Sequence, residues 1–138
     1  MALLHSAPDG FATLGRRRAL IAHAITWLAP ATLGAVMQTS LWAFGTQTWG
    51  EGWLMLWATA AVLMLSPAFT WFGLALAAPL TAVLMDRGWF GWLPALALGT
   101  GIGATLGWLA GTPLALPFGA GTALILRATL ARIAPEAF

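Results

Sequence analysis

The sequence predicts an all-α integral membrane protein, a four-helix transmembrane bundle with both termini in the cytoplasm (N-in/C-in). Hydrophobic residues make up 60% of the 138 residues and charged residues only 7%, whereas a soluble domain carries roughly 25% charged residues. So few charges cannot cover the surface of a soluble fold of this length. Uncharged stretches recur that are long enough, at about 1.5 Å per helical residue, to cross a hydrocarbon core of roughly 30 Å. Residues 1–138 are expected to form a single transmembrane domain.

The first span is predicted over residues 19–43. Three arginines, Arg16 to Arg18, stand directly before this apolar run. A signal peptide is the alternative interpretation, but the run is too long for its hydrophobic region and no small-residue cleavage site follows. A retained first helix is therefore expected.

The second span is predicted over residues 57–85. The chain stays uncharged from Trp53 to Met85, which is longer than one crossing requires and short for two. A single crossing leaves all arginines on one side of the membrane, whereas two crossings would move Arg87 to the other side. The tendency of positive residues to stay in the cytoplasm therefore favours one crossing, with a kink expected at Pro67.

Three tryptophans precede and open this second span. Trp49, Trp53 and Trp57 recur at every fourth position, so on a helix they would form one aromatic stripe. Tryptophan is enriched at the membrane interface. The three are predicted interface anchors, either in a stretch lying along the outer interface or at the start of a long tilted helix.

The third and fourth spans are predicted over residues 89–110 and 114–133, joined by a tight turn. Small residues recur at every fourth position in both, so each helix has one face with almost no side chains. In lipid such faces let helix backbones approach closely. The predicted helix-packing residues are Gly99, Gly103, Gly107 and Gly111 on the first helix and Ala115, Gly119 and Ala123 on the second.

Ionisable residues near the cytoplasmic ends of the spans form the main candidate site. Charged residues inside a membrane are costly and therefore suggest function. A basic pocket formed by His23, Asp86, Arg87 and Arg127 is predicted to bind an anionic lipid headgroup or another anion. The alternative is that Arg127 extends to the membrane surface and that His23 lies at headgroup depth, bonded to a carbonyl or a lipid.

His23 also allows a pigment or haem. The pattern Ala19-x-x-x-His23 followed by Trp27 resembles the way bacteriochlorophyll-binding helices of light-harvesting polypeptides present their histidine, and this resemblance implies a pigment ligand. A haem with two histidine ligands would need a second histidine in the membrane, but His5 lies in the N-terminal segment. Apart from this alternative, no cofactor and no metal are expected.

The remaining composition narrows the function. The chain has no cysteine, lysine or tyrosine, and its four acidic residues are scattered, so neither a catalytic set nor a metal-ligand cluster is evident and an enzyme is not expected. A net charge of +2 gives no reason to expect nucleic-acid binding. The sequence therefore predicts a multi-pass protein of a bacterial-type inner (cytoplasmic) membrane. Its predicted role is that of a non-catalytic accessory or scaffolding subunit. The expected partners are membrane lipids and other transmembrane helices, either its own or those of a larger complex. The alternative is a homo-oligomeric channel or small transporter for an apolar or anionic solute.

Overall fold

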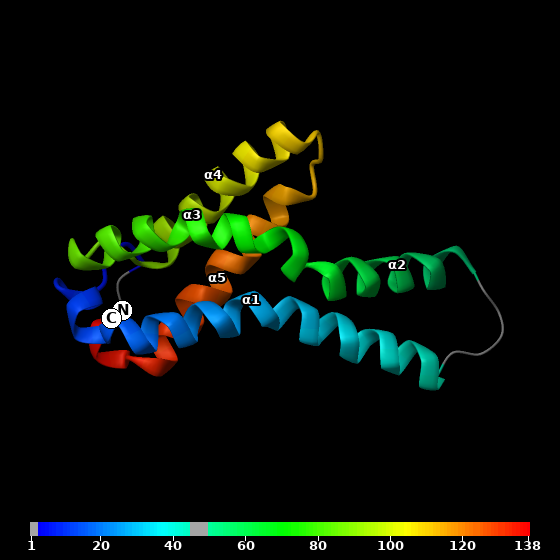
Figure 1. Ribbon diagram of the computed structural model, residues 1–138, viewed down its shortest axis with the longest axis horizontal. Coiled ribbons are helices and arrows are strands. Elements are labelled where there is room, and N and C mark those ends of the chain that lie inside the picture. The colour runs from blue at the N-terminus through cyan, green and yellow to red at the C-terminus, as the bar shows by residue number, and fades with distance from the viewer. Residues whose placement is uncertain (1–2, 45–49) are drawn as a thin grey trace.

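The computed structural model describes residues 3–44 and 50–138, which form helices joined by short turns with no strand among them (Figure 1). Helix α1 spans Gly10–Phe44 and therefore begins before the arginines, earlier than the expected span. Gly15 interrupts it with φ 74° and ψ 151°, a conformation that glycine adopts readily because it lacks a Cβ. This kink separates a short N-terminal turn from the long apolar part of α1.

Two consecutive helices run back along α1. Helix α2 spans Glu51–Leu65 and α3 spans Pro67–Asp86, with only Ser66 between them. Proline lacks the backbone N–H that a continuous helix needs but fits the first turn of a new one, so the break falls where the sequence predicts it. In Figure 1, α2 lies beside the C-terminal half of α1 and α3 beside the N-terminal half. The indole N–H of Trp27 donates to the carbonyl of Pro67 at 3.0 Å, which ties α1 to the break.

Helices α4 and α5 form an antiparallel hairpin that leans away from the α1–α2 pair (Figure 1). Helix α4 spans Trp92–Ala110 and α5 spans Ala115–Ile133. Gly111 ends α4 in the left-handed conformation, with φ 64°, and Thr112 N–H donates to the Gly107 carbonyl at 2.9 Å. A short 3₁₀ helix, η1, follows α5 over Pro135–Ala137.

The buried core lies at the end of the molecule where both described chain ends meet (Figure 1). There α1, α3, α4 and α5 converge with η1. The core is a cluster of mostly aliphatic side chains, namely Leu14, Ala19, Ala22, Met85, Phe90, Ala95, Leu126, Leu130, Ala134 and Ala137. The rest of the helical surface exposes leucine, phenylalanine and tryptophan side chains, which suits contact with lipid rather than water.

Three helices of the described chain, α1, α3 and α4, are long and apolar enough to span a membrane. The expected second span, 57–85, is divided between α2 and α3. Helix α2 is shorter, at 15 residues. Helix α5 has 19 residues but carries Arg127 and Arg132 and is not among the three. The all-helical fold is therefore confirmed, with three helices of the length and composition of membrane spans, while the count of four spans is a proposal taken up below.

Candidate functional site at the arginine-rich end

We call the end of the molecule that carries the arginines the arginine-rich end. The N-terminal segment, residues 3–9, holds this end together. Ser6 N–H donates to the carbonyl of Gly88, in the turn between α3 and α4, at 2.8 Å. The next residue, Ala7, donates to the carbonyl of Ala137 in η1 at 3.0 Å. The segment thus satisfies backbone groups of two distant parts of the chain and fixes both at one end of the molecule.

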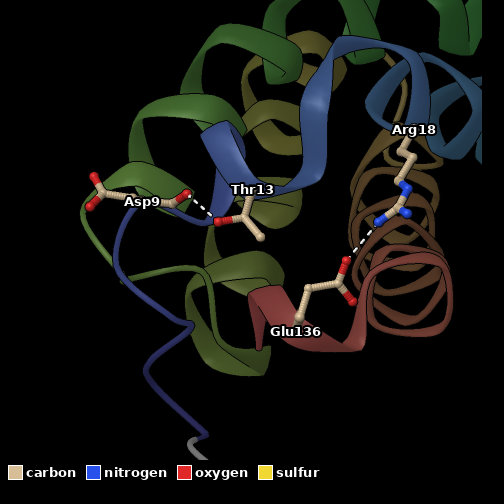
Figure 2. Close-up of polar contacts among 4 residues, drawn as sticks. All are labelled: Asp9, Thr13, Arg18 and Glu136. Atoms are coloured by element: carbon tan, nitrogen blue, oxygen red, sulfur yellow. Dashed lines mark hydrogen bonds and ion pairs between the residues drawn. The ribbon is translucent and has the colours of Figure 1, made fainter.

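An exposed ion pair closes this end between α1 and η1. Arg18 Nη1 lies 2.6 Å from Glu136 Oε1, and Figure 2 shows Arg18 reaching down from α1 toward Glu136. A backbone hydrogen bond at Glu136, together with the hydrogen bond and charge of Arg18, holds the pKa of the Glu136 carboxyl below its ordinary value. Both side chains are about half exposed, so the pair contributes little net stability and mainly positions the C-terminal segment.

Arg127 is buried rather than extended to the surface. Its side chain is 2% exposed, and its guanidinium carbon lies 3.7 Å from the ring centroid of Phe138 and 5.1 Å from that of Trp92. Such stacking of a cation on aromatic faces is stabilising in a desolvated place. Its Nε and Nη1 have no hydrogen-bond partner among the described residues. The surface-extended conformation considered from the sequence is therefore wrong.

The predicted four-residue pocket is not assembled. His23 points toward α3 and lines a groove between α1 and α3, whereas Arg127 points toward the start of α4 and the C-terminus. Asp86 and Arg87 are exposed at the end of α3, and within residues 3–44 and 50–138 no hydrogen bond or ion pair between side chains joins any two of the four. The sequence indicated their similar depth in the membrane, but depth does not fix the direction in which a side chain points.

The α4–α5 hairpin places most of the small residues of both helices against one another. A Cβ at Gly99 would overlap the carbonyl of Gly119 and the Cβ of Ala123. A Cβ at Gly103 would lie 2.5 Å from the carbonyl oxygen of Ala115. Backbones can approach this closely only where side chains are absent. We call this contact the glycine seam.

The seam ends before Gly111. A Cβ at Gly107 would lie 2.7 Å from the carbonyl oxygen of Thr112, in the turn after α4. A Cβ at Gly111 would meet nothing within 4 Å. Gly111 instead supplies the left-handed residue that ends the helix. Its assignment as a packing residue is corrected, because the chain turns there and leaves the helical face.

Two of the three predicted interface anchors, Trp53 and Trp57, lie at the N-terminal end of α2, and Figure 1 shows this end of α2 at the opposite end of the molecule from the two chain ends. Trp53 and Trp57 belong to the first two turns of α2, and Trp57 is 39% exposed. Trp49 lies outside the described residues. Residues 51–57 are helical and belong to α2, which Ser66 separates from α3; both alternatives, a helix along the interface and the start of a tilted span, stay predictions.

The sequence did not indicate the groove between α1 and α3. It has a volume of about 570 Å³, which falls within the roughly 300–1,000 Å³ of typical ligand sites. Arg16 and His23 contribute its ionisable side chains, and alanines of α3 line the opposite wall. The available signal was the spacing of Ala75, Ala78 and Ala82, which lie on one helical face and leave room there.

Compared with known proteins, the chain matches no protein-family model, no curated protein and no solved structure.

Proposed function

We propose that the chain crosses a bacterial-type inner membrane four times, through α1, the combined α2 and α3, α4 and α5, with both ends in the cytoplasm. The arginine-rich end supports this topology. The N-terminal segment is hydrogen-bonded to the α3–α4 turn and to η1, so an even number of crossings separates the two ends of the chain. Every arginine then falls at the same end, as the positive-inside tendency requires. Burial of Arg127 between aromatic rings lowers the cost of placing it in α5.

Within that membrane, we propose a non-catalytic accessory or scaffolding role, in which the chain packs against transmembrane helices of a larger complex. One observation carries the proposal: a second face of α4 remains open. Ala97, Gly101 and Thr105 are all exposed there and line a groove of about 400 Å³ beside α3. A Cβ at Gly101 would meet nothing within 4 Å. A face of small residues that the described part of the chain leaves uncovered lets a partner helix approach closely.

The proposed accessory role needs no catalytic group. Among the described residues, no three histidine, aspartate or glutamate side chains gather where they would hold a metal ion. The hydroxyls of Thr26, Thr39 and Thr105 donate to carbonyls of their own helices, as helix hydroxyls commonly do. Interaction by shape and close packing is therefore the proposed activity, and lipids and other transmembrane helices are the proposed partners.

The test is mass spectrometry of proteins that copurify with the tagged chain in mild detergent. Ala97→Leu fills the open face of α4 and is expected to lose the copurifying membrane protein. Ala104→Leu is the matched control, because Ala104 is also exposed on α4 but does not line the groove. Equal recovery of the same partner with both variants would contradict the proposed docking face.

The same purification distinguishes the alternative functions. A homogeneous homo-oligomer that passes solute into liposomes, with no larger complex, would favour a channel or small transporter. A coloured sample whose colour is lost in His23→Leu would favour a pigment- or haem-binding subunit. Recovery of a stoichiometric, colourless complex with another membrane protein supports the accessory role.

A further inference from the structure

The groove between α1 and α3 has the length of one membrane leaflet. Arg16 and Ala82 line its end near the arginines, and Trp27 and Trp71 line its other end. On each helix these end residues are eleven positions apart, which corresponds to roughly 16 Å along a helix. A hydrocarbon core of roughly 30 Å gives each leaflet about half that depth. The groove therefore matches the chain region of one leaflet.

The walls of the groove are apolar apart from its rim. Alanine and leucine side chains of α1 and α3 form most of the lining, with Phe11 near the kink of α1. Arg16 is exposed at the rim, and no carboxylate of the described residues pairs with it, since the ion pair at this end belongs to Arg18. An apolar channel with an unpaired cation at its membrane-surface end is complementary to an anionic amphiphile.

His23 lies in the same wall. Its Nδ1 lies 2.8 Å from the carbonyl oxygen of Ala19, and because a carbonyl can only accept, Nδ1 must carry a proton. The other nitrogen, Nε2, is buried without a partner among the described residues. It accepts a hydrogen bond when the ring is neutral and donates one when the ring is charged. Because Nε2 is buried, it is not exposed to the groove, and the wall of the groove stays apolar at this depth.

We propose that this groove binds one anionic phospholipid of the leaflet on the arginine side. One acyl chain lies between α1 and α3 and ends near Trp27 and Trp71, and Arg16 pairs with the phosphate. His23 lies seven positions further along α1 than Arg16, or roughly 10 Å deeper, beside the part of the groove that would hold the acyl chain. This inference requires the membrane location of the chain but not its role as an accessory subunit.

The experiment is native mass spectrometry of the whole chain released from nanodiscs of phosphatidylglycerol or of phosphatidylcholine with the same acyl chains. The wild type is expected to retain one phosphatidylglycerol in preference to phosphatidylcholine. Arg16→Gln is expected to lower retention about fivefold, since one basic residue near an anionic surface is worth about 1 kcal/mol. Arg17→Gln removes the same charge from a residue that does not line the groove and is expected to retain the lipid.

A second pair of variants tests the acyl-chain part of the groove. Ala78→Phe fills the groove from α3 and is expected to lose the lipid, whereas Ala68→Phe, exposed on α3 outside the groove, is expected to keep it. Equal loss in the two arginine variants would show general charge attraction and overturn the proposal. So would equal retention of the two lipids by the wild type, retention by Ala78→Phe, or a bound chromophore in place of the lipid. The arginine pair decides the question if Ala78→Phe fails to fold.

Discussion

The glycine seam between α4 and α5 gives a sharp prediction about stability. A Cβ at Gly103 would lie 2.5 Å from the carbonyl oxygen of Ala115 and 3.0 Å from Cα of Leu116. Both neighbours are backbone atoms and cannot rotate away, so Gly103→Ala must separate the two helices. Overpacking of this kind costs about 1–3 kcal/mol. The matched control is Gly101→Ala on the same helix, where a Cβ meets nothing within 4 Å and alanine improves helix propensity by up to about 1 kcal/mol.

Both substitutions gain the same helix propensity, so the two variants should differ in the free energy of unfolding by the cost of overpacking alone, about 1–3 kcal/mol. The assay is reversible unfolding in mixed detergent micelles, followed by circular dichroism as the denaturing detergent is increased. Gly103→Ala should unfold at a lower fraction of denaturing detergent than the wild type, and Gly101→Ala at the same fraction or a higher one. If both variants unfold together with the wild type, α4 and α5 do not pack through the seam and the reasoning is refuted.

Two further predictions concern topology and the buried arginine. A reporter fused after Thr112 should lie in the periplasm and one fused after Phe138 in the cytoplasm, because an even number of spans keeps all arginines on one side. A periplasmic signal from the fusion after Phe138 would mean an odd number of spans and would contradict the topology. Arg127→Lys should lower the free energy of unfolding by about 1 kcal/mol, since lysine keeps the charge but loses the planar stacking on Trp92 and Phe138. Arg127→Met should be no less stable than Arg127→Lys, because it removes a buried charge that has few partners. Wild-type stability of Arg127→Lys in the same unfolding assay would show that stacking on the two rings does not stabilise the fold.

Local sequence signals placed most helix ends. Gly111 and Pro113 mark the turn between α4 and α5, and Pro67 marks the break between α2 and α3. These signals work because the missing N–H of proline and the positive φ of glycine act on the chain nearby. The early start of α1 was missed. Its first turn is followed by an irregular residue at Gly15, and nothing in the apolar pattern shows that the chain before the arginines is helical.

The candidate site was predicted less well, because it depends on which way side chains point. His23 and Arg127 stand at comparable distances from the arginine-rich ends of their helices, which suggested a shared pocket. In the structure the N-terminal segment and η1 pack over this end, Phe138 lies on Arg127, and His23 turns to the groove beside α3. The spacing of apolar residues within α1 or α5 does not show how each helix is rotated about its own axis.

The sequence by itself determined the membrane class, since a chain with 7% charged residues has no means of covering a water-exposed surface, and helices satisfy their own backbone in lipid. Its small-residue repeats also indicated which faces can pack closely. Tertiary structure alone decided which small faces pair within the chain and which stay open. It also decided that Arg16 rather than Arg127 accompanies His23. The physical reason is that hydrogen bonds within a helix are local, whereas the rotation and crossing of packed helices follow from contacts between residues far apart in the chain.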